Sequence, residues 1–123
     1  MSKKVLVVED SAAMRSLIAS TVEELTGYET VEAGNGFEAL KALPGHRFDL
    51  IITDINMPDI NGLEIIHFVK GNAAYKEIPL IIVTTEQGEA DRKKGLALGA
   101  SEYITKPFDP EKLKAAVKRI TRG

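Results

Sequence analysis

The sequence contains no cysteine and no tryptophan, and only 6% of its residues are aromatic. Without cysteine the chain cannot form disulfide bonds, bind a metal through thiolates or use a cysteine nucleophile. No apolar run approaches the roughly 20 residues of a membrane-spanning helix, and the first apolar run is too short for a signal peptide. The net charge of −2 lacks the basic excess typical of nucleic-acid-binding surfaces. We therefore expect a cytoplasmic protein that contacts neither membranes nor nucleic acid directly.

The chain alternates short runs of β-branched residues with segments of helical periodicity, five times over. A length of 123 residues is usual for one domain, so we expect a single domain over residues 1–123. The expected strands are 4–8, 29–33, 48–53, 79–84 and 102–106, and the expected helices are 11–26, 36–43, 62–71, 88–98 and 109–121. This order predicts an α/β fold with a doubly wound, five-stranded parallel sheet. Most of the strands are continuously apolar, as in central strands, whereas the stretch at 28–33 includes glutamates and is typical of an edge strand.

Two of the expected helices carry more specific predictions. In the first, Leu17 and Ile18 belong to an apolar stripe that we expect to be buried. Either Asp10 or Ser11 could cap the start of this helix. In the helix expected at 88–98, Gly95 either makes the helix marginal and easy to move or allows close packing, and the sequence favours neither.

Polar residues stand where four of the apolar strands end. These residues are Glu9 and Asp10, then Asp54, Thr84 and Lys106. The carboxyl ends of parallel strands meet at one edge of the sheet, so we expect these side chains to lie together. Oxygen ligands suit Mg²⁺, and three carboxylates gathered without a cation would repel one another. The alternative for the acidic pair alone is that Asp10 caps a helix and Glu9 is a solvated turn residue.

The same residues suit phosphoryl chemistry. A carboxylate such as Asp54 can act as a plain metal ligand or as a phosphoryl acceptor. Phosphoryl transfer needs a cation and a positive side chain near the phosphoryl oxygens, and Lys106 could supply the latter. Thr84 could donate a hydroxyl, although a threonine at a strand end is by itself a weak signal. The turn at 56–62 could present a backbone carbonyl to a cation.

These motifs resemble the receiver domains of two-component response regulators, and in particular the stand-alone, CheY-like kind. The resemblance covers residues 3–121 and includes five features in the family's order. They are Val8-Glu9-Asp10, Thr53-Asp54-Ile55-Asn56-Met57-Pro58 with Gly62, Val83-Thr84, Gly99-Ala100, and Tyr103 with Lys106-Pro107-Phe108. It implies a flavodoxin-like sheet with the strand order 2-1-3-4-5.

The resemblance also implies roles for individual residues. Asp54 would accept a phosphoryl group from a sensor histidine kinase or a phosphotransfer domain. The implied Mg²⁺ ligands are Asp10, Asp54 and the backbone carbonyl of Asn56, with Glu9 acting through water. Lys106 would pair with Asp54 and then with the phosphoryl oxygens.

Further residues are implied to switch the protein or to set its rates. Thr84 would move to hydrogen-bond the new phosphate, and Tyr103 would turn inward as it does so. Asn56 and Glu86 occupy the positions that tune hydrolysis of the aspartyl-phosphate. Thr85 stands where the family usually has a small residue, so we expect slower phosphorylation or dephosphorylation than with alanine.

The implied function is a phosphorylation-dependent signalling switch rather than an enzyme, although such domains promote their own phosphotransfer and dephosphorylation. We expect a downstream target protein to bind the face formed by 86–98 and 102–121, which is rich in lysine and arginine. The chain would be a monomer or a weak phosphorylation-dependent dimer. Because the chain ends with its last helix, we favour output by protein binding of the chemotaxis type.

Several alternatives stay open. The chain could be a receiver excised from a larger transcriptional or enzymatic regulator, a phosphorelay intermediate or an inactive receiver used for binding alone. A flavodoxin-like mononucleotide binder should carry a Ser/Thr/Gly-rich loop after the first strand, where this chain has Glu9-Asp10-Ser11. A phosphatase with an aspartate nucleophile should have two aspartates flanking one residue there, together with a larger cap.

Overall fold

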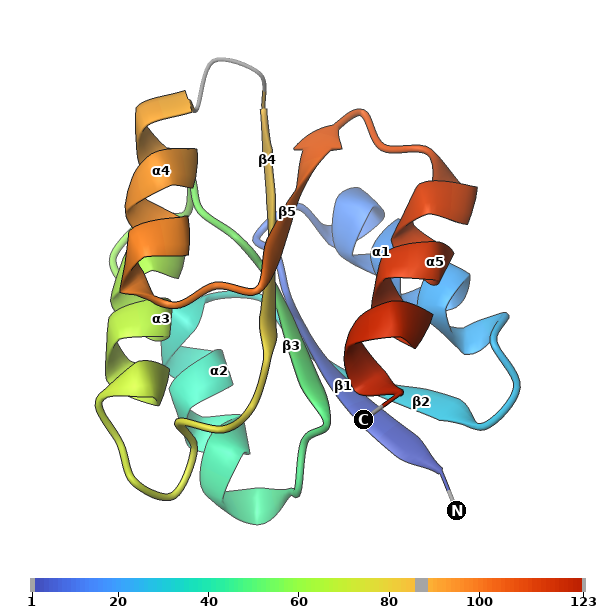
Figure 1. Cartoon of the computed structure of the whole chain (residues 1–123), viewed down its shortest axis with the longest axis horizontal. Coiled ribbons are helices and arrows are strands. Elements are labelled where there is room, and N and C mark those ends of the chain that lie inside the picture. The colour runs from blue at the N-terminus through green and yellow to red at the C-terminus, as the bar shows by residue number, and fades with distance from the viewer. Residues whose placement is uncertain (1, 86–88, 123) are drawn as a thin grey trace.

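The computed structural model describes residues 2–85 and 89–122, which form a five-stranded parallel sheet flanked by helices (Figure 1). The strands are β1 (Lys3–Val8), β2 (Tyr28–Ala33), β3 (Leu50–Asp54), β4 (Leu80–Thr85) and β5 (Glu102–Lys106). The helices are α1 (Ala12–Glu23), α2 (Gly36–Ala42), α3 (Gly62–Lys70), α4 (Glu89–Leu98) and α5 (Pro110–Thr121), with a short 3₁₀ turn at Leu43–Gly45. The strand order is β2-β1-β3-β4-β5, which confirms the predicted doubly wound fold and the edge position of β2.

The helices divide between the two faces of the sheet. Figure 1 shows α1 and α5 on one face and α2, α3 and α4 on the other. Successive strand side chains point to opposite faces, so each strand feeds both cores. In β1, Val5 and Val7 pack with α1 and α5, whereas Leu6 and Val8 pack with α2 and α3. Burial on both faces explains why the central strands are continuously apolar.

The helix predictions needed one correction. The expected buried stripe of α1 included Leu17, which is 46% exposed, whereas Ile18, Ala19 and Val22 are buried. The predicted burial of Ile18 is confirmed, and the buried side of α1 extends from it to Ala19 and Val22 rather than to Leu17. Of the two candidate caps, Ser11 is the one that accepts a hydrogen bond from the helix, at 3.3 Å from the backbone nitrogen of Met14.

Gly95 allows close packing of α4 on the sheet. A Cβ atom built at this position would overlap the terminal methyl of Ile82 in β4 and lie 3.6 Å from that of Ile66 in α3. The structure thus supports the packing interpretation of this glycine over that of a weakened helix. Residue 95 holds α4 directly against the strand that leads to the predicted site.

Within the ranges 2–85 and 89–122, no helix has both the length and the apolar composition that crossing a membrane requires.

Candidate functional site

The residues predicted to meet at the sheet edge do so. Glu9 and Asp10 follow β1, Asp54 is the last residue of β3, and Lys106 is the last residue of β5. Thr84 lies in β4, between the strands that carry Asp54 and Lys106. The parallel register brings these strand ends level, because Asp54 is paired with Val83 and Thr85 with Lys106.

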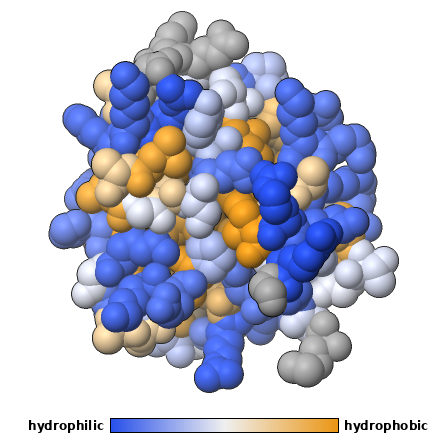
Figure 2. Space-filling model, viewed as in Figure 1, coloured by the Kyte–Doolittle hydropathy of each residue, from blue (hydrophilic) through white to orange (hydrophobic). Residues whose placement is uncertain are grey.

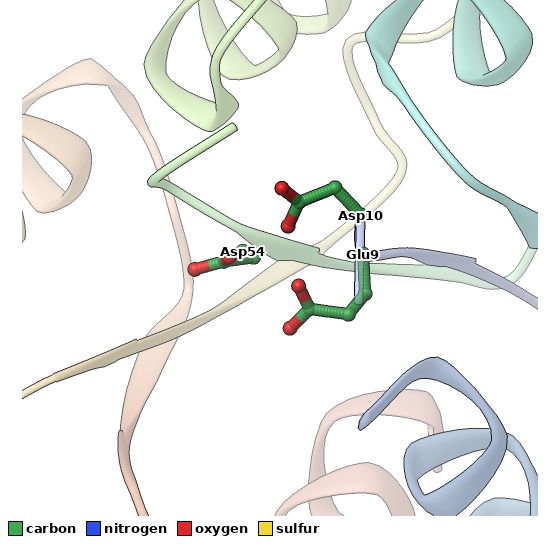
Figure 3. Close-up of side chains that lie close together, drawn as sticks. All are labelled: Glu9, Asp10 and Asp54. Carbon is green, nitrogen blue, oxygen red and sulfur yellow. The ribbon is translucent and has the colours of Figure 1, made fainter. Parts of the chain in front are cut away.

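Three carboxylates form the centre of the site. One oxygen from each of Glu9, Asp10 and Asp54 lies within 4.8 Å of the others. Figure 3 shows Glu9 and Asp10 extending side by side from the end of β1, with Asp54 beside them at the end of β3. Glu9 and Asp54 are only 1% and 4% exposed, whereas Asp10 is exposed. The cluster therefore has a buried base and an open side at Asp10.

Lys106 bridges the two buried carboxylates. Its Nζ lies 2.7 Å from Oε1 of Glu9 and 3.3 Å from Oδ2 of Asp54. Burial alone would lower the pKa of this ammonium, but the Glu9 and Asp54 carboxylates outweigh that effect and raise its pKa. Sequence reasoning predicted the pairing with Asp54, and the structure adds that the shorter contact is to Glu9.

The pKa of Glu9 is raised to about 7. Burial is the largest cause, and the neighbouring carboxylates of Asp54 and Asp10 add to it, while Lys106 opposes it. One lysine thus does not compensate the negative charge that the fold gathers here. A second positive charge at the open side would favour the ionised form of Glu9.

The backbone after β3 is folded tightly beneath Asp54. The backbone nitrogen of Asn56 donates to Oδ1 of Asp54 at 3.3 Å, and that of Gly62 donates to the carbonyl of Ile55 at 3.1 Å. A Cβ atom at residue 62 would overlap the Asp54 carbonyl oxygen and lie 2.8 Å from the Cα of Ile55. Only glycine fits this approach. Asp59, and not Gly62, has the positive φ of this loop, +65°. Glycine is required at residue 62 because its backbone lies against that of Asp54 and Ile55.

The Thr84 hydroxyl is buried and unsatisfied within the described residues. The residue is 2% exposed, and its Oγ1 has no hydrogen-bond partner among the residues that the structure describes. A buried polar atom of this kind is uncommon and calls for an explanation in terms of function or an absent partner. Thr85 is exposed at the end of β4, whereas Glu86, which we predicted to tune hydrolysis, lies outside the described residues.

Tyr103, the predicted switch residue, contacts helix α4. Its ring is half-buried, and the guanidinium carbon of Arg92 lies 4.4 Å from the ring centroid. Arg92 also donates a hydrogen bond to the tyrosine hydroxyl. Sequence reasoning placed Arg92 only on a basic face and missed this contact, for which residue spacing within α4 offers no signal.

This geometry defines a class of site: a carboxylate cluster at the carboxyl edge of a parallel α/β sheet, with one lysine and one buried hydroxyl. Comparison with known proteins identifies the family. The chain matches the response regulator receiver domain over residues 5–118. It is 45% identical to the chemotaxis protein CheY1 of Helicobacter pylori over 95% of each chain. It is 38% identical to the phosphate regulon transcriptional regulator PhoB of Klebsiella pneumoniae, covering 99% of this chain and 53% of PhoB.

A solved structure leads to the same result. The chemotaxis protein CheY4 of Vibrio cholerae superposes with a TM-score of 0.89 at 38% identity, covering 98% of this chain and 99% of that one. The protein therefore belongs to the response regulator receiver domain family. Receiver domains are signalling modules of two-component systems that act between sensor histidine kinases and downstream targets.

Proposed function

We propose that this protein is a phosphorylation-dependent switch in which Asp54 accepts a phosphoryl group from the phosphohistidine of a sensor kinase or phosphotransfer domain. A carboxylate oxygen of Asp54 forms a bond to phosphorus while the phosphorus–nitrogen bond of the donor breaks. The electron pair of that bond leaves with the imidazole, which takes up a proton. The observation that carries this proposal is the buried Asp54 carboxylate held 3.3 Å from Lys106 within the acidic cluster.

The donor set at the sheet edge fits a hard divalent cation. Carboxylate oxygens within 4.8 Å of one another suit Mg²⁺, which often takes only one or two protein carboxylates together with waters. Asp10 and Asp54 would hold the ion with the backbone carbonyl of Asn56, and Glu9 would act through water. When bound, Mg²⁺ supplies positive charge that neutralises the phosphoryl oxygens as the group is transferred.

Lys106 and Thr84 would receive the phosphoryl group. Phosphorylation replaces the single charge of the Asp54 carboxylate by a group carrying about two negative charges, and it adds three acceptor oxygens. The Lys106 ammonium already contacts Asp54 and needs only to turn from Glu9 toward the new oxygens. The Thr84 hydroxyl, which has no partner among residues 2–85 and 89–122, would gain one by donating to a phosphoryl oxygen.

The response to phosphorylation would pass through β4 and α4. Tyr103 is the register partner of Ile82, the residue on which Gly95 seats α4. Arg92 ties α4 to the Tyr103 ring and hydroxyl. Thr84 follows Ile82 closely on β4. A shift of Thr84 toward the phosphate would therefore disturb the packing of α4 on Ile82 and on Tyr103, and would bias the orientation of Tyr103.

The output surface that we propose is the groove between β5 and α5. This groove has a volume of about 680 Å³ and an apolar lining that includes Ile104 and Phe108. Its charged lining residues are Lys106, Lys112, Arg119, Glu102 and Asp109, and Arg119 forms an ion pair with Glu102. Figure 2 shows apolar side chains surrounded by hydrophilic ones over this region. Lys112, beside the apolar part of this groove, would be the contact for an acidic residue in a largely apolar segment of a downstream protein. Reversing the charge with Lys112→Glu should weaken target binding, whereas Lys41→Glu, exposed on α2, should not.

We favour a chemotaxis-type pathway in the cytoplasm, with the chain acting as a single domain. The support is the similarity to chemotaxis proteins over 95% of both chains. The rival function, a receiver module of a larger transcriptional regulator, is supported by the match to 53% of PhoB. The site chemistry is the same in both cases, so the test of phosphorylation serves either one.

The test is intact mass spectrometry after incubation with acetyl phosphate, with and without Mg²⁺. We expect a Mg²⁺-dependent gain of one phosphoryl group, absent from Asp54→Asn. Asp49→Asn is a matched control, because Asp49 is exposed before β3 and contacts Lys4 rather than the cluster. No gain in the wild-type protein, or an equal gain in Asp54→Asn, would refute the assignment of Asp54.

A further inference from the structure

We propose that Arg15 is a positioning residue of the cation site, because its guanidinium fixes the peptide that joins Glu9 to Asp10. This inference rests on the proposed function, since it concerns the same site. Arg15 lies in α1, outside the carboxylate cluster, and its side chain is 23% exposed. Its Nη1 donates a hydrogen bond of 2.8 Å to the backbone carbonyl oxygen of Glu9.

The contact determines the direction of Asp10 through the geometry of the peptide bond. The carbonyl of Glu9, the nitrogen of Asp10 and both Cα atoms lie in one plane. The backbone nitrogen of Glu9 is already fixed, because it donates to the carbonyl of Ala33 at 3.1 Å. Arg15 therefore sets the plane of the next peptide. That plane fixes the point from which the Asp10 side chain leaves the chain.

Asp10 is the ligand that most needs this support. Glu9 is held by Lys106 at 2.7 Å, and Asp54 by Lys106 and by the backbone nitrogen of Asn56. Asp10 is exposed at the open side of the site, so burial does not fix it. A backbone anchor would help to keep its oxygen within 4.8 Å of the other two.

The guanidinium itself is held by an ion pair with Glu32 and is bordered by the backbone at Gly34. Its Nε lies 3.3 Å from Oε1 of Glu32, which follows Val31 on β2. A Cβ atom at residue 34 would come within 3.2 Å of Nη1, so the backbone at Gly34 borders the group closely. Arginine links β1 and β2 in this way because its donors form a rigid fork, which the single ammonium of lysine cannot reproduce.

The test is the affinity for Mg²⁺ alone, measured by isothermal titration calorimetry. We expect Arg15→Met to raise the Kd roughly tenfold, the scale on which residues that orient metal ligands act. Arg15→Lys keeps the charge but loses the fork and should show most of this loss. Glu32→Gln removes the exposed ion pair while keeping the carbonyl contact, and it should change the Kd by less than about twofold.

Two further measurements separate positioning from folding. Thermal unfolding without Mg²⁺ shows whether each variant is folded, and the ¹⁵N–¹H resonance of Asp10 should shift in Arg15→Met without added ion. A Kd within about twofold of wild type in a folded Arg15→Met, or a wild-type Kd in Arg15→Lys, would overturn the proposal. A loss in Glu32→Gln as large as in Arg15→Met would overturn the carbonyl assignment.

The two possible failures are distinguishable. Wild-type protein that binds no Mg²⁺ refutes the cation site itself and this inference with it. Wild-type protein that binds Mg²⁺ while Arg15→Met binds it equally well refutes only the role of Arg15.

Discussion

Two buried threonines at neighbouring strand ends provide an internal comparison. Thr53 in β3 and Thr84 in β4 are 0% and 2% exposed. The hydroxyl of Thr53 donates to the carbonyl of Asp54 at 3.0 Å, whereas that of Thr84 has no partner in the part of the chain that the structure describes. The same substitution, threonine to valine, should therefore have opposite effects on stability at these two positions.

The expected magnitudes follow from the cost of an unmade hydrogen bond. Leaving a buried hydroxyl unsatisfied costs about 1–3 kcal/mol, whereas a formed hydrogen bond contributes about 1 kcal/mol. Thr84→Val replaces the hydroxyl by a methyl of similar size, so it should raise the free energy of unfolding by about 1 kcal/mol. For a domain of this size that corresponds to a rise in Tm of about 4 °C. Thr53→Val should lower the free energy of unfolding by about 1 kcal/mol.

Urea denaturation followed by far-UV circular dichroism measures both changes, since the chain has no tryptophan to report by fluorescence. The slope of the transition should not change. If Thr84→Val and Thr53→Val were both less stable than wild type, the Thr84 hydroxyl would have to be satisfied. That result would refute the reasoning. Thr84→Val should still be phosphorylated, but its phosphorylated form should lose target binding.

Three further predictions concern pH, rates and packing. Because the pKa of Glu9 is raised from 4.5 to about 7 in the folded chain, the folded state binds more protons between these values. Without Mg²⁺ the stability contributed by Glu9 should therefore fall as the pH rises from 4.5 to about 7, by on the order of 3 kcal/mol. If Glu9→Gln showed the same dependence of stability on pH as wild type, this would count against the assignment. Thr85→Ala should speed phosphorylation or decay of the phosphorylated protein, and unchanged phosphorylation and decay rates would remove Thr85 as a rate determinant. Gly95→Ala should destabilise the chain by about 1 kcal/mol despite better helix propensity, and Ile82→Val should relieve that cost; additive effects would contradict the contact.

The sequence was sufficient to predict the architecture and the location of the site for one physical reason. All strands of a parallel sheet end at one edge, so residues that are remote in sequence, such as Asp54 and Lys106, can be placed together from the strand pattern alone. The same rule does not give distances. That Lys106 lies closer to Glu9 than to Asp54 depends on side-chain packing at the buried base of the site.

The predictions that failed or fell short depended on tertiary contacts. The predicted burial of Leu17 was wrong, whereas that of Ile18 was right. The sequence offers Ala19 and Val22 as well as Leu17 beside Ile18, and only packing on the sheet decides which of them are buried. The hydrogen bond from Arg15 to the Glu9 carbonyl was also missed, although the sequence contains a signal for it. Helical side chains point back toward the N-terminus, so an arginine shortly after an acidic turn is well placed to reach that turn.

The resting site places a limit on how the proposed switch can work. A ligand shifts a two-state equilibrium only by its differential interaction with the two states, and moving it from 1:99 to 99:1 takes about 5.5 kcal/mol. Satisfying the Thr84 hydroxyl supplies only about 1–3 kcal/mol of this. Thr84 alone therefore cannot account for a complete switch. The remainder has to come from the charges, and Lys106 is the cation already in place, because it divides its contacts between Glu9 and Asp54 and would turn toward the phosphoryl oxygens.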